Sequence, residues 1–571
     1  MAEKLISPGV FTAENDLSFI PAGVGEIGGA IVGPTVKGPA MVPTIVNSYA
    51  EYVQMFGDTF QSGSSNTEFL TSISAREYLK HSGTLTVVRI MPDSYSNASS
   101  VVSQSDGTGS AFTLNTIADG VIMNSVSTEK AGGILPSGSK DNLRWEVTSV
   151  NNSKGTFTLL IRRGNDTSKN KVILETHNGL SLDPNSPNYI SKRIGDQRNT
   201  LSSDGSYIQP SGNYPNQSSY VYVSGVADTF DYLDPAGSVR VAEASGSLPS
   251  AGSGSFAGGT DGTGASGAKA MFDDIAAANV QGLDPTVASK GKTNYENAFT
   301  LLSNQDEYDI NLLWAPGLNN MDHGDMCNKL IEACENRGDC FAIVDPVGYG
   351  KTLANAVTQG GNEDSSYAAM YWPWVQTSAN GKYVWVPAST LVPGVIAFND
   401  KVSHEWYAPA GLNRGGLSSA IQAERKLTHA NRDDLYEANI NPLATFPGEG
   451  VCAWGQKTLQ RKASALDRIN VRRLLINLKK FIASTSRYLV FENNTSATRN
   501  RFLASVNPYM ESVQEKNGLY AFKVVMDDTN NTPDIIDRNI MKGEIFLQPA
   551  KAAEFIVVDF NIMPTGATFE D

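Results

Sequence analysis

The sequence predicts a multidomain protein of mixed α/β and α+β class, and three observations predict this class. A chain of 571 residues is long for a single hydrophobic core and is expected to form roughly three or four domains. Apolar strand-like runs and helix-like stretches alternate over residues 21–92 and again beyond residue 268. Between them, residues 93–220 are rich in Ser, Asn, Gly and Thr and carry the alternating β-branched runs of a β-rich domain.

The α/β pattern depends on six segments. The first strand-like run is closed by Gly33 and Pro34, which are strong turn residues. The predicted strands are Ala30–Val32, Leu85–Ile90, Ile310–Trp314 and Phe341–Val344. The predicted helices are Phe69–Lys80 and Cys327–Arg337. Because the same rhythm occurs before and after the β-rich segment, we expect one α/β domain that is interrupted by an outward insertion.

The insertion and the last third of the chain have their own patterns. Within the insertion, the predicted strands are Trp145–Val150, Phe157–Ile161 and Val172–Thr176. The Ser- and Gly-rich tract 244–268 is typical of a flexible linker. Later, apolar residues recur at spacings of three and four, as one buried helix face requires: Leu466, Ile469, Leu474, Leu475, Leu478, Phe481 and Ile482.

Both ends of the chain are expected to be extended arms. The N-terminal residues lack helical periodicity, and the C-terminal runs Glu544–Leu547 and Phe555–Phe560 have strand composition on either side of Pro549. Two extended ends on a compact body suit strand exchange between neighbouring subunits. The candidate arm residues are Ser7, Pro8, Gly9, Val10, Phe11, Phe555, Ile556, Val557 and Val558.

These observations predict five regions. They are an N-terminal extended arm (1–20), an α/β middle domain (21–92 and 221–364), an inserted β-rich outer domain (93–220), a C-terminal body (365–543) and a C-terminal strand or arm (544–571).

Composition excludes several functional classes. Apolar residues make up 40% and charged residues 18%, which is ordinary for a globular protein. A net charge of −14 argues against nucleic acid as a direct partner. The first thirty residues lack the apolar core of a signal peptide, and no later stretch approaches the roughly 20 apolar residues of a membrane span. Neither nucleic-acid binding nor membrane insertion is expected.

No catalytic, cofactor or metal site is predicted. The four cysteines, Cys327, Cys334, Cys340 and Cys452, form no CxxC pair and are expected to be buried or free reduced thiols. The five histidines show no HExxH motif. Asp322, His323 and Asp325 could contact a cation, but a solvated polar turn is the favoured interpretation. The protein is therefore not expected to be an enzyme.

One segment superficially matches a phosphate-binding loop. In VGYGKT, residues Gly350, Lys351 and Thr352 match the end of the Walker motif. That motif requires a glycine five residues before Gly350, and this position holds Asp345, followed by Pro346. A carboxylate there would repel phosphate, so an ordinary turn is favoured and nucleotide binding remains a distant alternative.

A strongly basic segment lies within this acidic chain. From Gln456 to Lys480 there are eight cations against the single carboxylate of Asp467, a local charge of +7 (eight minus one). The same segment carries the apolar stripe described above. It could be a solvated outer helix face or a surface that meets an acidic partner.

Seven short signatures occur in one order along the chain. They are SPGVFTAE (7–14), GGAIVGPTVKGP (28–39), HSGTLTVVRI (81–90), NGLSLDPNSPNYI (178–190), GGTDG (258–262), GEGVCAWGQKTLQRKASALDRINVRRLL (448–475) and KAAEFIVVDF (551–560). Together they resemble the tail sheath proteins of contractile bacteriophage tails. The resemblance implies a conserved-type sheath body, built from the N-terminal arm and the C-terminal region, with the middle domains displayed outward.

The resemblance also implies a function. Sheath subunits form six-membered rings that stack helically around a tail tube and contract to drive the tube through the host envelope for genome delivery. It implies a homo-oligomer in the virion tail, assembled in the host cytoplasm, with the tube, baseplate and tail terminator proteins as partners. The expected tube-facing residues are Arg468, Arg472, Arg473, Lys479 and Lys480. The sheath of a DNA-free injection machine, a tailocin or a type VI secretion apparatus, remains an alternative.

Overall fold

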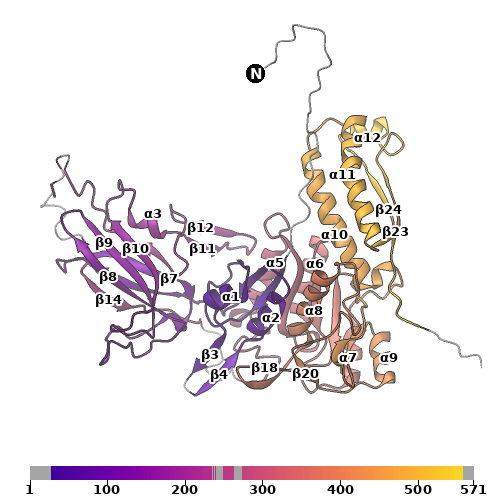
Figure 1. Cartoon of the computed structure of the whole chain (residues 1–571), viewed down its shortest axis with the longest axis horizontal. Helices are drawn as coiled ribbons and strands as arrows, with labels where there is room; N and C mark the ends of the chain where they lie inside the picture. The colour runs from indigo at the N-terminus through magenta and orange to yellow at the C-terminus, as the bar shows by residue number, and fades with distance from the viewer. Residues whose placement is uncertain are drawn as a thin grey trace, which may run out of the picture. The chain divides into compact units, whose positions relative to one another are not determined.

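The computed structural model describes residues 28–556, apart from residues 63, 235, 237, 240–247 and 263–272. The chain divides into two compact units. The larger contains Glu26–Ile476 and Ala552–Asp571, and the smaller contains Met1–Gly25 and Asn477–Lys551. Figure 1 shows the elements of both units by colour along the chain.

An eight-stranded sheet organises the larger unit. Its order is β2-β5-β1-β15-β16-β17-β21-β22, and only the two edge strands run antiparallel to their neighbours. The strands are β1 (Gly28–Gly33), β2 (Thr44–Val46), β5 (Leu85–Arg89), β15 (Ile310–Asn319), β16 (Phe341–Asp345), β17 (Ala368–Trp372), β21 (Ile440–Phe446) and β22 (Gly450–Ala453). The four strands predicted for the α/β pattern are confirmed. The expected domain boundary at residue 364 falls inside this sheet, between β16 and β17.

Helices cover both faces of the sheet, so its strands are apolar on both sides. Neighbouring residues of one strand point to opposite faces, which places Ala30 in one core and Ile31 in the other. The first core contains side chains of α5 (Lys292–Leu302), α6 (Asn320–Arg337), α7 (Leu353–Gly360) and α9 (His429–Glu437). The second contains side chains of α1 (Tyr49–Phe56), α2 (Leu70–Leu79) and α8 (Ala388–Val402).

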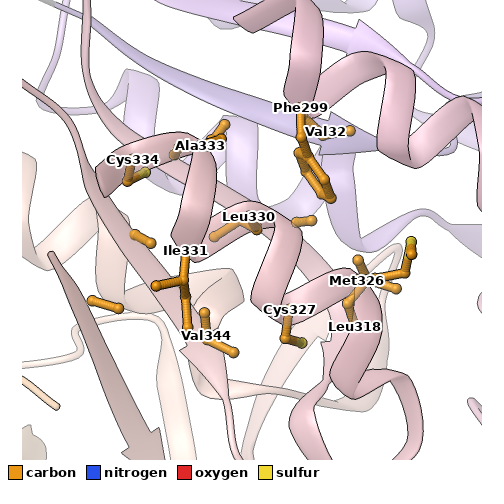
Figure 2. Packing of buried hydrophobic residues seen from close by; sticks show 14 of the residues in the cluster. Val32, Phe299, Leu318, Met326, Cys327, Leu330, Ile331, Ala333, Cys334 and Val344 are labelled. Atoms are coloured by element: carbon orange, nitrogen blue, oxygen red, sulfur yellow. The ribbon is translucent and has the colours of Figure 1, made fainter. Parts of the chain in front are cut away.

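Figure 2 shows the first core around α6. Leu330 and Ile331 pack there with Phe299 of α5 and Val344 of β16. All four cysteines are buried and free, which confirms the expectation of buried thiols. Burial also raises the pKa of the Cys327 thiol well above its ordinary value, which keeps it protonated and unreactive.

The insertion contains two antiparallel sheets that share one apolar core. The first sheet has β6 (Asn97–Ser103), β7 (Ser110–Asp119) and β13 (Val221–Ser224); the second has β8 (Leu143–Asn151), β9 (Thr156–Arg163), β10 (Ile173–Ser181) and β14 (Gly252–Ser255). Phe112 of β7 stacks on Phe157 of β9 with ring centroids 5.6 Å apart. The short helix α3 (Ile190–Ile194) and the hairpin β11 (Arg198–Leu201) with β12 (Ile208–Ser211) complete this region.

The described part of the insertion extends beyond residue 220. Strand β14 pairs with β8, although its sequence, GSGS, lies in the tract expected to be a linker. Backbone hydrogen bonds also join Ser96 to Thr260, next to the point where the chain leaves the sheet domain. The two ends of the insertion therefore lie close together near Asp93 and Gly262, whose backbones are in contact.

Smaller sheets complete the larger unit. Strands β18 (Val375–Ala379), β19 (Lys382–Val386) and β20 (Ala420–Ala423) form an antiparallel sheet in the order β19-β18-β20. A hairpin joins β3 (Thr59–Ser62) and β4 (Ser65–Glu68). The single-turn helices η1 (Val121–Met123), η2 (Ala288–Lys290) and η3 (Ala465–Asp467) lie in connecting segments.

The described part of the smaller unit is built on a long helix and a hairpin. Helix α10 (Ile469–Ser486) begins in the larger unit, three residues after the expected Leu466, and is followed by η4 (Arg487–Leu489) and α11 (Ser496–Glu515). Strands β23 (Leu519–Val525) and β24 (Glu544–Pro549) pair antiparallel and flank α12 (Pro533–Asp537). Phe481 of α10 stacks on Tyr509 of α11, with ring centroids 3.6 Å apart.

Candidate assembly surfaces

The VGYGKT loop is closed by contacts within the chain. The Gly350 N–H donates to Oε1 of Glu424 at 3.0 Å. The N–H that a bound phosphate would need is therefore already hydrogen-bonded to a carboxylate. The Thr352 hydroxyl accepts from the Asn355 N–H and caps α7. Tyr349 packs on Trp374 and Trp385. This arrangement explains the loop as a capped turn and gives the nucleotide alternative no support.

Asp345, the residue that stands where a Walker glycine would be, has a structural contact. Its Oδ1 accepts from the Ser389 N–H at 2.9 Å, and its Oδ2 accepts from the Ser389 hydroxyl at 2.5 Å. The carboxyl therefore satisfies a backbone donor in the first turn of α8. Complete burial raises its pKa to about 7, although both hydrogen bonds from Ser389 act to lower it.

The solvated polar turn favoured for Asp322, His323 and Asp325 is wrong, because these residues form the first turns of α6 and His323 is buried. Asn319 caps α6 by accepting from the Asp322 N–H, and the backbone bends at His323. The His323 ring is buried; its Nδ1 accepts from the Asn319 N–H and its Nε2 donates to the Ala277 carbonyl. Asp325 pairs with Lys292 at 3.2 Å. Among the described residues, no three His, Cys, Asp or Glu side chains gather as a metal site would require.

The basic segment begins with side chains that bond to the chain itself. The Lys457 ammonium donates to the Tyr436 carbonyl at 2.7 Å and lies 4.5 Å from the centre of that tyrosine's ring. The backbone N–H of Arg461 donates to Asp364, and its guanidinium donates to the Glu363 carbonyl. Both side chains therefore make their polar contacts within the chain.

Two of the expected tube-facing residues are buried, which corrects that part of the sequence interpretation. Arg473 is 2% exposed, and its guanidinium forms two hydrogen bonds with the Asp400 carboxylate, at 2.7 and 2.5 Å. Arg472 is 4% exposed, lies 4.1 Å from the centre of the Tyr367 ring and donates to the Ser366 hydroxyl. Neither guanidinium is available at the surface of the chain in this conformation.

Arg468 holds the C-terminal segment by a forked ion pair. Its Nε donates to Oε1 of Glu554 at 2.7 Å and its Nη2 donates to Oε2 at 3.1 Å. Gln456 and the Tyr436 hydroxyl donate to the same carboxylate. Burial alone would raise the pKa of Glu554, but these hydrogen bonds lower it below its ordinary value. We call this group the Glu554 anchor.

Phe555 and Ile556 follow the anchor and are 80% and 84% exposed. Neither residue belongs to a strand. The other candidate arm residues, Ser7–Phe11, Val557 and Val558, lie outside the described residues. Within the described residues β23 and β24 pair only with each other, so their sheet has two open edges. Tyr520 on β23 and Phe546 on β24 are 64% and 57% exposed.

The last two basic candidates lie on the part of α10 that belongs to the smaller unit. Lys479 is exposed and Lys480 is half-buried. Phe481, Leu478 and Leu474 are buried, as their apolar spacing predicts.

No helix among the described residues combines the length and apolarity that crossing a bilayer demands.

Sequence pattern alone did not reveal the partners of the basic segment. Asp400 lies 73 residues before Arg473 and forms no local motif with it. Glu554 offered a weak signal, since it is the one carboxylate in the run from Lys551 to Val558, among small and apolar residues. A charged side chain in such a run often has a specific partner.

Two solved sheath structures resemble this fold. The chain is 15% identical to the helical sheath of the anti-feeding prophage in its contracted state, with a TM-score of 0.50 over 97% of this chain and 98% of that one. It is 10% identical to a sheath tail protein of Listeria innocua, with a TM-score of 0.51 over 89% and 90% of the two chains. The mixed α/β multidomain fold is thus that of sheath proteins.

Sequence comparison finds two phage tail sheath domains in the second half of the chain. Residues 289–459 match the phage tail sheath protein central domain, and residues 461–563 match the phage tail sheath C-terminal domain. The tail sheath protein of Vibrio phage KVP40 is 38% identical over 226 residues, which is 39% of this chain and 34% of that protein. The matched part thus spans about a third of the length of that curated relative. Residues 289–563 therefore carry the central and C-terminal domains of phage tail sheath proteins.

Proposed function

We propose that the protein is the structural sheath subunit of a contractile phage tail. Subunits polymerise as stacked hexameric rings around a tail tube, and contraction drives the tube through the host envelope to deliver the genome. The observation that carries this proposal is the consecutive match of the central and C-terminal sheath domains over residues 289–563. The sheath-like fold over nearly the whole chain supports it.

Contraction in this proposal is a switch between two packings of the same subunits. The energy is stored in contacts between proteins during assembly, so the role is structural and requires no nucleotide. The baseplate and tail terminator are the proposed partners at the two ends of the sheath, in a virion tail assembled in the host cytoplasm. A DNA-free injection machine would use the same subunit chemistry; neighbouring genes for a capsid and a terminase would distinguish the two.

Electron microscopy of the expressed chain tests the proposal. Striated hollow cylinders with six-fold symmetry are expected at high protein concentration or on added tail tubes. A protein that stays monomeric at high concentration, with and without tubes, would contradict the sheath function.

We also propose that both ends of the chain add strands to neighbouring subunits. The two open edges of the β23–β24 sheet, with Tyr520 and Phe546 exposed on it, are suitable receivers. The exposed Phe555 and Ile556 leave the Glu554 anchor as donors. An added strand gains backbone hydrogen bonds and buries alternate side chains.

Deletion of residues 1–20 should leave a folded chain that no longer forms tubes, because the donor strand is lost while the described core is untouched. Circular dichroism and thermal unfolding should match the full chain, while electron microscopy shows no cylinders. Phe555→Asp should weaken assembly in the same way, with Lys551→Asp as the matched control. Tubes of normal length from the truncated chain would rule out the N-terminal arm.

The tube-facing surface is proposed to include Lys479 and Lys480 of α10, while Arg468 holds the C-terminal segment. Lys479→Glu with Lys480→Glu should reduce co-sedimentation with tail tubes. Each exposed pair contributes on the order of 0 to 1 kcal/mol, but a helical lattice repeats the contact. Raised salt should reproduce part of the loss. Lys154→Glu with Lys169→Glu in the insertion is the control, and equal binding by both double variants would reject this surface.

The insertion is proposed to be displayed outward and dispensable for polymerisation. Because Asp93 and Gly262 are in contact, removing residues 94–261 and joining these two residues should preserve the eight-stranded sheet. A cut at residue 220 should instead leave β14 without its partner β8 and promote aggregation. The measurement is tube formation by each variant. Loss of tubes from a folded 94–261 deletion would show that the insertion makes essential ring contacts.

A further inference from the structure

An aromatic and basic surface lies at the carboxyl edge of the parallel sheet. We call it the carboxyl-edge face and define it by Tyr349, Tyr383 and Trp385 with the cations Lys351, Arg425 and Lys426. Tyr349 follows the end of β16, and β18–β19 begin directly after β17. Tyr383 is 70% exposed and Tyr349 is 48% exposed. Exposed aromatic residues beside arginine are enriched at protein interfaces.

Two of the three aromatic residues, Tyr349 and Trp385, are held in place before any partner arrives. The Tyr349 ring contacts Trp374 and Trp385, with centroids 5.8 and 5.4 Å away. Glu424 accepts from the Gly350 N–H and fixes the loop that carries Tyr349. In β18, Val375 and Thr377 are buried, so they face the inner side of the β18–β19 sheet. Tyr383 and Trp385 of β19 pair with the residues that alternate with them, and therefore lie on the outer side. Tyr349 and Trp385 therefore have little side-chain entropy left to lose on docking.

The charge of this surface is opposite to that of the chain. The cations Lys351, Arg425 and Lys426 lie near two carboxylates, Glu424 and Asp322, whose Oδ2 lies beside Gly348, a balance of +1 (three minus two). The whole chain carries −14. A partner of negative charge would be attracted to this surface, and a second copy of this chain is such a partner.

The amino edge of the same sheet carries the complementary charge. Residues Asp306, Glu307 and Asp309 are exposed in the loop between α5 and β15. Because β15, β16 and β17 are parallel, a loop that precedes β15 lies at the edge opposite to the loops that follow β16 and β17. We call residues 304–309 the amino-edge loop.

We propose that the carboxyl-edge face of one subunit docks on the amino-edge loop of a second copy of this chain. The contact is head to tail, because the two surfaces lie at opposite edges of one sheet. A heterologous contact of this kind generates rings or helical filaments instead of closed two-fold dimers. The inference rests on the proposed function and names the surfaces through which sheath subunits join.

Charge reversal tests the contact in the full chain. Arg425→Glu with Lys426→Glu, or Asp306→Lys with Glu307→Lys, should each raise the protein concentration needed for tubes at least about tenfold. The two double variants should assemble when mixed, since each then supplies the charge that the other lacks. Lys154→Glu with Lys169→Glu is the control with the same charge change as the Arg425 and Lys426 variant. Wild-type tubes from both variants alone would overturn the contact and leave the sheath function intact.

A cross-linking experiment decides the contact even if no tubes form. Tyr383→Cys and Asp306→Cys chains are mixed at high concentration and oxidised; the four native cysteines are buried. A disulfide-linked dimer is expected in the mixture and in neither variant alone. If that dimer appears while the wild type never polymerises, the contact stands and the sheath function fails. If wild-type tubes form but the mixture yields no dimer above the single-variant samples, the contact is wrong.

Discussion

Asp345→Asn should make the protein more stable above pH 7 and less dependent on pH. The folded-state pKa of this buried carboxyl is raised to about 7 from an ordinary value of 3.8. A raised carboxyl pKa adds stability that is fully present below about pH 4 and is lost as the pH rises through 7. The loss is on the order of 4 kcal/mol when the shift is converted at about 1.4 kcal/mol per pH unit.

Denaturant unfolding at several pH values measures this effect. The wild type is expected to lose stability between pH 4 and 8, whereas the asparagine variant, which keeps an acceptor for the Ser389 N–H, is not expected to show this component. Ser389→Ala is the informative second variant. It removes a hydrogen bond that favours the ionised carboxyl, so it should move the loss of stability to higher pH. Parallel profiles for all three proteins would contradict a neutral, buried Asp345.

Asp400→Ala should be among the most destabilising single changes in the larger unit. It leaves the Arg473 guanidinium buried at 2% exposure with its carboxylate partner gone. Burial would lower the pKa of Arg473, but Asp400 outweighs burial and raises it, so the arginine is held charged. Breaking one side of such a pair typically costs about 3–5 kcal/mol.

A double variant separates the ion pair from its packing. Asp400→Leu with Arg473→Leu should recover most of the stability, since a buried pair can be replaced by apolar residues at little net cost. Lys401→Ala, at the next position of α8, is the control and should change stability by no more than about 0.5 kcal/mol. If Asp400→Ala lowers the free energy of unfolding no more than this control does, the Asp400–Arg473 pair does not stabilise the fold.

Much of the fold could be predicted because its signals are local. The β-branched run Ala30–Val32 and the apolar run Phe341–Val344 are short and closed by turn residues, and both are buried strands. The spacing of Leu474, Leu478 and Phe481 likewise indicates one buried helix face. These features depend on neighbouring residues, so one sequence is sufficient to find them.

Other features depend on distant residues and could not be read from the sequence. β14 is a strand because β8 offers it an edge, and its Gly and Ser residues carry no strand preference. β17 joins the sheet beside β16 through parallel pairing, which a composition-based boundary at residue 364 does not detect. Arg472 and Arg473 carry charge in the sequence, but Tyr367 and Asp400 decide that they are buried.

The Glu554 anchor sets a tether length for the C-terminal segment. Val558 lies four positions after Glu554, and four extended residues span at most about 14 Å of backbone. Any strand of a neighbour that pairs with Phe555–Val558 must therefore approach within about that distance of the Glu554 backbone. If the proposed strand exchange occurs and the clamp holds while subunits rotate in the proposed contraction, the connection acts as a pivot of limited reach.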